Sequence, residues 1–148
     1  MLHQKLRANL WRDKKRAQEA ASMSGRAMRH GEKEGDGSVR ALQGALFRLQ
    51  FNSYRLPAEH RPQTANTNPY TLSNVNASWG PFFITKAPDI PPGKRHPSAE
   101  RAEFGIVYGP QTELSVRLFQ QQAGFRADGL AGMVTLHRID EILVYLGE

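Results

Sequence analysis

The sequence predicts a mainly α-helical fold, and three observations support this prediction. Apolar side chains recur at helical spacing in three separate segments. Two of these segments follow short glycine-containing turns and carry a threonine close to the expected start of the helix. Eight of the nine prolines lie together between residues 52 and 104. We therefore expect a small helical unit that is interrupted by one long irregular insertion.

The first expected helix covers residues 38–51. Its apolar residues recur at helical spacing and form one stripe: Val39, Leu42, Leu46 and Leu49. Ser38 follows a break rich in glycine, at a position where its hydroxyl would serve as the N-cap. This stripe should face the core.

Two consecutive turn-plus-helix units follow between residues 105 and 143. Gly109 and Gly132 stand just ahead of the expected helices, where a sharp turn favours a positive φ angle. Pro110 fits a first helical turn because its missing N–H has no partner there. We expect the hydroxyls of Thr112 and Thr135 to cap backbone N–H groups at the helix starts.

The second unit also contains Asp128-Gly129, a dipeptide typical of tight turns. On the two helices, the apolar residues share one face. We expect one core cluster made of Val39, Leu42, Leu46, Val116, Phe119, Leu136 and Ile139.

These two units, with Phe119-Gln120 between them and Leu42-Gln43 in the preceding helix, resemble the peptidoglycan-binding-like domain. That family is a three-helix module built from a short internal repeat, and it binds rather than catalyses. The resemblance covers residues 38–51 and 105–146. It implies a cell-wall glycan or stem-peptide ligand held by turn and helix-start residues: Tyr108, Gln111, Thr112, Arg126, Asp128 and Thr135.

The chain departs from the family pattern in three places. A long insertion replaces the usual short turn after the first helix, no Asp-Gly precedes Gly109, and Met133 stands where the family often has proline.

The expected organisation is a basic helical arm at 1–30, a linker at 31–37, the domain at 38–51 plus 105–146, and the insertion at 52–104.

The net charge of +6 is concentrated in the arm, which contains eight Lys or Arg residues and two acidic residues. Three interpretations stay open: a solvated helix that touches a partner subunit, an arm that binds nucleic acid, and an organellar targeting segment. We expect the arm to lie outside the domain, with Lys14, Lys15 and Arg16 contacting a partner.

The insertion contains one apolar cluster, at Trp79, Phe82, Phe83 and Ile84. Such a cluster is too apolar to stay in water, so it should be buried either on the chain's own helices or in another subunit. The surrounding prolines and asparagines favour an anchor in another subunit over a lid, with Trp79, Phe82 and Phe83 as contact residues.

Several chemistries have no support in the sequence. There are no cysteines, which excludes disulfides, thiol catalysis and cysteine-based zinc sites. No metallopeptidase His pattern or phosphate loop occurs, so we expect no catalytic residues, no bound metal and no cofactor. No apolar run is long enough for a membrane span, and residues 1–30 lack the apolar core of a secretory signal.

Two functions remain as expectations. The first is a non-catalytic binding or structural module of a larger particle, with peptidoglycan as ligand, such as a phage, virion or bacterial wall-contacting component. The second is a structural subunit of an intracellular assembly, such as an organellar ribosome or respiratory complex, where the domain serves as a protein–protein scaffold. Other protein subunits are partners in both.

Overall fold

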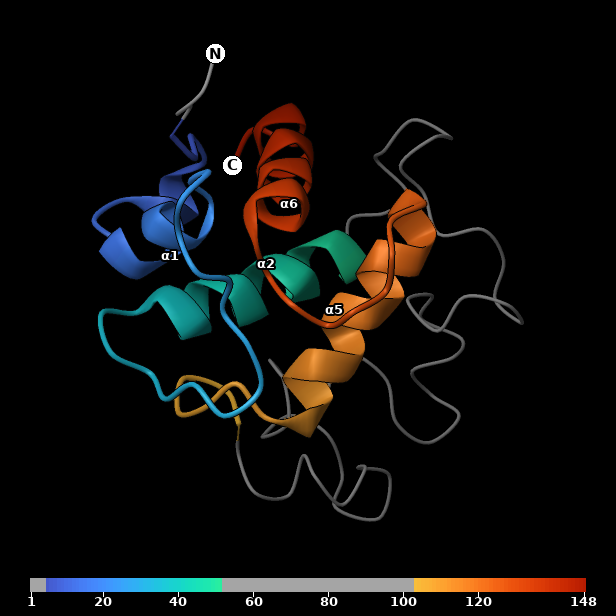
Figure 1. Ribbon diagram of the computed structural model, residues 1–148. Coiled ribbons are helices and arrows are strands. Elements are labelled where there is room, and N and C mark those ends of the chain that lie inside the picture. The colour runs from blue at the N-terminus through green and yellow to red at the C-terminus, as the bar shows by residue number, and fades with distance from the viewer. Residues whose placement is uncertain (1–4, 52–102) are drawn as a thin grey trace.

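The computed structural model describes residues 5–51 and 103–148. These residues form four α-helices, α1 (Lys15–Ala20), α2 (Ser38–Phe51), α5 (Pro110–Ala123) and α6 (Met133–Tyr145), and a short 3₁₀ helix, η1 (Asn9–Trp11) (Figure 1). Two isolated β-bridges join backbone segments, and no strand forms within the described ranges. The prediction of a mainly α fold is confirmed.

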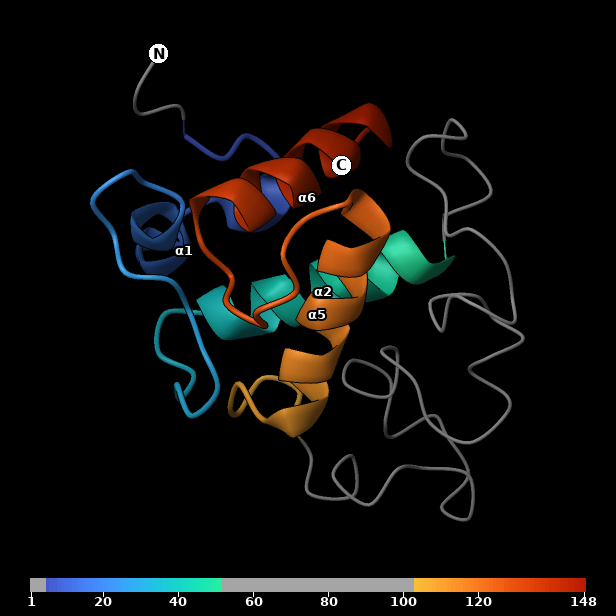
Figure 2. The same cartoon turned by 45° about the vertical axis from the view of Figure 1, so that its right-hand side comes forward.

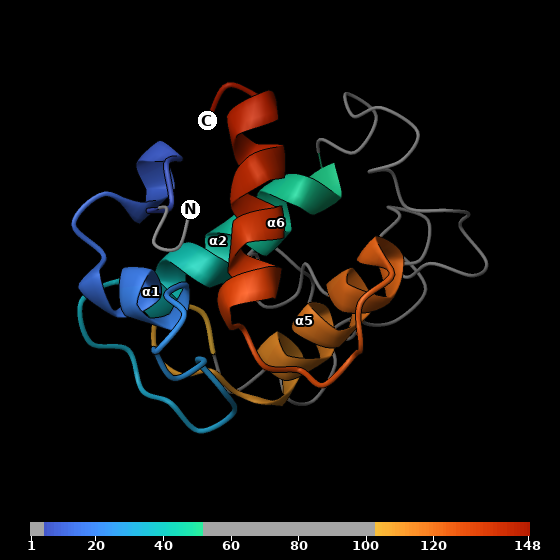
Figure 3. The same cartoon turned by 45° about the horizontal axis from the view of Figure 1, so that its top comes forward.

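Helix α2 is the centre of the packing, because α1, α5 and α6 all contact it (Figure 2, Figure 3). All seven predicted core side chains are buried in one cluster. Leu42, Leu136 and Ile139 have no exposed surface at all. Burying a side chain of this size contributes about 1.5–3 kcal/mol, so this cluster is the main source of stability for the three helices.

The N-terminal segment belongs to the same core, and the prediction of an arm outside the domain is wrong. Trp11, Ala17 and Met28 are completely buried with the residues of α2 and α6. The backbone N–H groups of Arg7 and Ala8 donate to the Asp140 carboxylate on α6 at 2.8–3.0 Å. The helical part of this segment is also shorter than expected, because only η1 and α1 are helical here.

The physical reason is that this segment buries a short face of alanines and two separate large side chains instead of a long stripe of large apolar residues. Small side chains on α1 bring its backbone close to the other helices, and Ala17, Ala20 and Ala21 are all buried. Trp11 enters the core from η1 and Met28 from an extended stretch. Ala17, Ala20 and Ala21 stand at helical spacing, but their side chains are small, and Trp11 and Met28 lie outside α1, so the pattern of large apolar residues gave no sign of a core-facing segment.

The start of α2 is held by two acidic side chains rather than by Ser38. Ser38 is the first helical residue, and its hydroxyl accepts a hydrogen bond from the backbone N–H of Ala17 at 2.9 Å. The carboxylates of Asp36 and Glu34 accept from the N–H groups of Ser38 and Arg40. The predicted N-cap role of Ser38 is therefore wrong, and its side chain instead connects α1 to α2.

The predicted linker and the residues before it run along both repeat turns. Met28 and Ala131 exchange two backbone hydrogen bonds at 2.9 and 3.1 Å. Further on, Gly31 donates to the carbonyl of Tyr108, and Tyr108 donates to the carbonyl of Glu32. Residues 28–34 thus connect the two turns along one edge of the domain.

Most of the insertion, including the predicted anchor residues Trp79, Phe82, Phe83 and Ile84, lies outside the described residues. Among the residues that are described, no helix is long and apolar enough to cross a membrane.

Candidate functional site: two repeat turns

The first turn, residues 103–109, is organised by the buried carboxylate of Glu103. It accepts hydrogen bonds from the backbone N–H groups of Gln111 and Thr112, both at 2.9 Å, and from the Thr112 hydroxyl at 3.0 Å. A carboxylate at this place satisfies free N–H groups at the start of α5 and complements the positive end of the helix dipole. The expected capping role of Thr112 is therefore wrong, because Glu103 supplies the acceptor.

Gln43 on α2 holds the same turn from the core side. Its side-chain N–H₂ group lies within 2.9–3.3 Å of the carbonyls of Glu103 and Val107 and of the Thr112 hydroxyl oxygen. Its side-chain oxygen accepts from the backbone N–H of Gly105 at 2.8 Å. A single buried amide thus satisfies both donors and acceptors of an irregular loop.

Gln120 on α5 plays the equivalent part for the second turn, residues 124–132. Its N–H₂ group lies 3.0 Å from the Asp128 carboxylate, the Leu130 carbonyl and the Thr135 hydroxyl. Its oxygen accepts from the backbone N–H of Gly129 at 2.9 Å. Thr135 therefore bonds to Gln120 and does not cap α6, so that expectation is wrong as well.

The glycines of the two turns are required for different reasons. Gly129 has a φ of +77°, which confirms the predicted tight turn, and the Asp128 carboxylate accepts from the N–H of Leu130. Gly109 and Gly132 have φ angles of −104° and −111°, so the expected positive φ is wrong. A Cβ at Gly109 would lie 2.5 Å from the carboxyl carbon of Glu103, which explains why glycine is needed there.

Tyr108 joins the two turns. Its side chain is completely buried, and its hydroxyl donates to the carbonyl of Gly129 at 2.6 Å. Burial raises the pKa of the Tyr108 phenol far above its ordinary value of 10, so this group stays protonated and keeps donating. The two turns are thereby fixed relative to one another.

Glu113, near the start of α5, connects this face to residues 28–34. It pairs with His30 at 3.1 Å and with Arg117 at 3.0 Å. Partial burial by itself raises the pKa of Glu113, but the hydrogen bonds from His30 and Arg117 outweigh it and hold the pKa below the ordinary 4.5. The carboxylate therefore stays charged under mildly acidic conditions.

The predicted ligand-binding residues fall into two groups. Tyr108, Gln111, Thr112 and Thr135 are brought together with the two turns, but their side chains are buried. Arg126 is exposed and Asp128 is half-buried. Among these six residues Arg126 therefore has the exposed side chain, and the buried four support the shape of the turns.

The predicted partner-binding residues of the arm also differ from each other. The Arg16 guanidinium is used inside the chain, where it pairs with Glu32 at 2.7 Å and donates to the carbonyls of Arg26 and Ala27. Its hydrogen bond with Glu32 raises the pKa of Arg16. Lys15 is exposed, and Lys14 donates to the carbonyl of Arg12 at 3.2 Å. Their contact with a partner stays a prediction.

The sequence reasoning missed the residues that organise the turns, namely Glu103, Gln43 and Gln120. A signal was present for the glutamines. Gln43 lies four residues after Val39, and Gln120 lies four residues after Val116, so both occupy the apolar face of their helices. A buried amide must be hydrogen-bonded, which predicts an adjacent irregular backbone. Glu103 has no such signal, because it precedes its helix in an irregular segment.

Across the described ranges, no three His, Asp or Glu side chains gather in a way that could hold a metal ion. The two turns form a surface whose backbone is held by buried hydrogen bonds.

Comparison with known proteins gives one match. No curated protein and no solved structure matches the chain. Residues 105–139 match the family described as "Putative peptidoglycan binding domain". The match begins inside the first turn, includes all of α5 and the second turn, and ends in the first half of α6. This turn–helix–turn part of the chain is thus similar to a peptidoglycan-binding domain, as the sequence pattern predicts.

Proposed function

We propose that this chain is a non-catalytic module that binds peptidoglycan through the surface of its two repeat turns. The observation that carries the proposal is the family match, which covers the second turn completely and most of the first. Both turns are held rigid by buried glutamines and by Tyr108. A surface fixed before binding loses little conformational entropy when the ligand arrives.

The exposed side chains of the matched segment fit this class of ligand. Ile106, Met133 and Val134 are large apolar residues that remain exposed next to the turns. Arg126 is exposed and makes no side-chain hydrogen bond within the described residues. Apolar groups can pack on sugar rings, and a free guanidinium can bind a peptide carboxylate with two hydrogen bonds.

A finer form of the proposal concerns the particle that carries the module. A phage-particle or bacterial wall-contacting component would use the turns to hold a larger assembly against the wall, with other subunits bound elsewhere on the chain. Incorporation of the chain into such a particle, measured separately from wall binding, tests this form.

The proposal is tested by sedimentation with purified cell-wall sacculi from which phosphate-containing polymers have been removed. The full chain should pellet with intact sacculi and stay in solution after the sacculi are digested with a muramidase. Arg126→Ala should weaken pelleting several-fold, while the matched control Arg138→Ala, in the middle of α6, should not. If as much of the chain pellets with digested sacculi as with intact sacculi, or if none pellets with either, wall binding is contradicted. Release of soluble fragments by the chain alone would contradict the non-catalytic part.

A second candidate is a protein–protein scaffold in an intracellular assembly. One observation favours it: four of the six predicted ligand side chains are buried, and residues 28–34 pair with both turns. Under this function the chain does not sediment with sacculi. It co-purifies with a stable set of subunits, and the turn surface is protected from hydrogen exchange only in that complex.

A further inference from the structure

The outer face of α6 takes no part in the core. The buried residues of this helix face the other helices, and Figure 3 shows α6 lying over α2 with its opposite side turned away from it. On this outer side the side chains of Val134, Glu141 and Tyr145 are exposed. Arg138 lies among them and is partly exposed.

These four residues form a narrow stripe along the helix. Val134, Arg138, Glu141 and Tyr145 follow one another at spacings of four, three and four residues. At about 100° per residue, the four positions lie within about 60° of one another around the helix. This is the spacing of the a and d positions through which two helices pair in a coiled coil. An outer helix face usually carries polar residues alone, so an apolar residue at each end of the stripe indicates a contact.

The order of residues in the stripe makes it complementary to itself. Two copies of α6 that pair antiparallel, with a twofold axis between positions 139 and 140, place Arg138 of each copy opposite Glu141 of the other. The same register places Val134 opposite Tyr145, again twice. A parallel pair places Arg138 opposite Arg138 and Glu141 opposite Glu141, which is unfavourable. Charge complementarity therefore selects both the partner and its orientation.

The two charged groups of the stripe are only weakly engaged within one chain. Nη1 of Arg138 lies 3.5 Å from Oε1 of Glu141, at the upper limit for a hydrogen bond. The Glu141 side chain is 60% exposed. Each group can therefore exchange this long contact for a closer one with a second copy.

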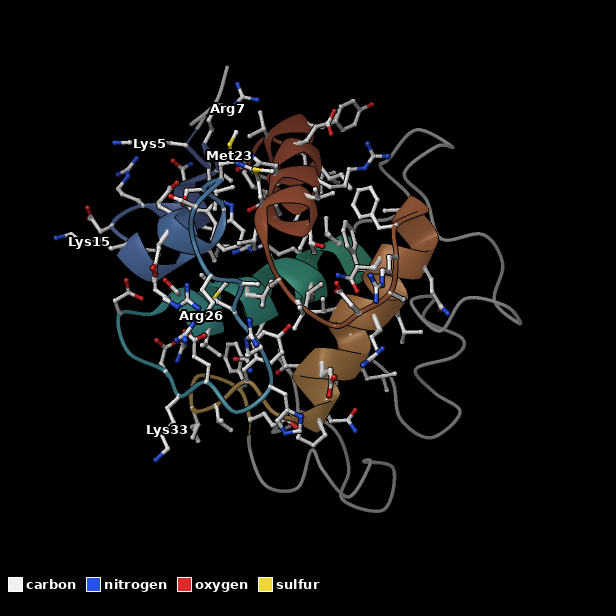
Figure 4. All side chains as sticks on the ribbon, in the orientation of Figure 1. Lys5, Arg7, Lys15, Met23, Arg26 and Lys33 are labelled. Carbon is white, nitrogen blue, oxygen red and sulfur yellow. The ribbon has the colours of Figure 1, made fainter. Side chains whose placement is uncertain are left out.

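Further apolar surface lies beside Val134. The carbonyl oxygen of Ala21 lies 3.1 Å from Nε2 of His137, so the residues after α1 run beside the first half of α6. Met23 belongs to this stretch and is 54% exposed, and Figure 4 shows it close to α6. A methionine side chain is flexible and packs well against aromatic rings. This end of the stripe is thus suited to receive the ring of Tyr145 from a second copy.

We propose that the outer face of α6 is a docking surface for a second copy of this chain, and that the two α6 helices pair antiparallel. Four positions on a helix of 13 residues bury less surface than a stable dimer needs, so the dimer is weak and depends on concentration. Val134 then faces the second copy. Met133, about 100° away around the helix, stays exposed beside the second turn.

A lipid surface fits this face less well than a second copy does. A helix that lies on a membrane has a wide apolar face with many Lys and Arg residues beside it. Here two apolar residues enclose one basic and one acidic residue. Such a balanced stripe matches a protein surface of the same kind, not an anionic one.

Sedimentation velocity at several protein concentrations tests the dimer, at physiological salt so that the net charge of +6 on each copy is screened. Arg138→Glu turns both opposite-charge pairs into Glu–Glu pairs and should raise the dissociation constant by about tenfold or more. The double variant Arg138→Glu, Glu141→Arg restores complementarity and should dimerise like the parent. Arg138→Ala adds no like charge and should change the dissociation constant only a few-fold, because exposed ion pairs are weak.

The matched control is Lys33→Glu, which makes the same change of charge at an exposed residue outside the stripe. Figure 4 shows Lys33 projecting away from α6. This variant should dimerise like the parent. A parent that stays monomeric at millimolar concentration would overturn the proposal, and so would a double reversal that dimerises no better than Arg138→Glu.

Disulfide trapping tests the orientation, because the chain has no cysteine of its own. Val134→Cys and Tyr145→Cys are prepared as separate proteins and are oxidised alone and as a mixture. In the antiparallel pair these two positions are opposite, whereas identical positions lie about 16 Å apart along the helix axis, too far for a disulfide. Covalent dimers should therefore form in the mixture alone. Covalent dimers of either variant by itself would contradict the antiparallel pair.

Thermal melts at low protein concentration distinguish a second copy from another part of the same chain as the occupant of this face. Tyr145→Glu should abolish dimerisation and leave the melting temperature of the monomer unchanged, because the side chain is exposed. A lowered melting temperature of the monomer would show that the chain itself covers the face, and the proposal would fail. Because no sacculi are used, the outcome does not depend on wall binding.

Discussion

Two buried glutamines determine the local structure of the repeat turns. Gln43 and Gln120 each bond to a glycine N–H and a backbone carbonyl of one turn and to a threonine hydroxyl in the first turn of the helix that follows. A side-chain amide suits this role because it carries donors and acceptors but no charge, which would be costly to bury. Each turn therefore depends on one side chain from the preceding helix.

Replacing Gln120 with leucine should destabilise the domain strongly. Leucine fits the apolar face of α5 but leaves the N–H of Gly129 and the carbonyl of Leu130 without partners, at a cost of about 2–4 kcal/mol. Urea unfolding measures this loss. The control is Gln121→Leu on the exposed side of the same helix, which should stay within about 0.5 kcal/mol of the parent. An equally stable Gln120 variant would contradict the role given to this amide.

The pairing of Glu113 with His30 and Arg117 should make part of the stability depend on pH. Since the folded-state pKa of Glu113 is lowered, its contribution is fully present above the ordinary pKa of 4.5. The contribution is lost as the pH falls below that value and through the folded-state pKa. Unfolding midpoints of the parent and of Glu113→Gln should therefore converge in acid. A difference that stays constant below pH 4.5 would show that the ion pairs do not contribute.

At the scale of elements, the helices could be predicted and the N-terminal packing could not. Helices α2, α5 and α6 each carry apolar residues at helical spacing and follow a glycine-containing turn, so their positions follow from local sequence although the predicted caps are wrong. The N-terminal segment is basic and lacks a stripe, and its burial depends on contacts with distant residues such as Asp140. Such contacts leave no local pattern.

The N-terminal segment should therefore be needed for folding. Trp11→Ala removes a completely buried ring from the shared core and should cost about 3–5 kcal/mol. The neighbouring Arg12→Ala, which changes an exposed side chain, provides the control. Thermal unfolding followed by circular dichroism compares the two. If Trp11→Ala melts at the same temperature as the parent, the segment is not part of the cooperative core.

At the scale of the whole molecule, the described residues close one core although residues 52–102 separate the two halves. The side-chain nitrogen of Gln43 on α2 lies 3.3 Å from the carbonyl oxygen of Glu103. The end of α2 at Phe51 is then on the order of 12 Å further along the helix axis. A linker of about eight residues is long enough to cover such a distance.

Replacing residues 52–102 with a Gly/Ser linker of about eight residues should leave the domain folded. The shorter loop should also stabilise it by roughly 1–2 kcal/mol, because closing a shorter loop costs less entropy. The full chain with Trp79→Ala and Phe82→Ala is the companion variant. Unchanged or raised melting temperatures in both would support the anchor interpretation of the insertion, and lowered temperatures in both would support a lid.

The burial of Leu143 distinguishes α6 from α5. Thr112 and Thr135 are 23 residues apart, and the same offset from Gln120 leads to Leu143. Leu143 occupies the eleventh position of α6 as Gln120 does in α5, yet it is completely buried in the core. An apolar side chain cannot form the hydrogen bonds that hold such a turn. Leu143 thus adds to the core of the described residues instead of holding a turn. A turn held by α6 in the way that α5 holds residues 124–132 would require an amide such as glutamine at this position.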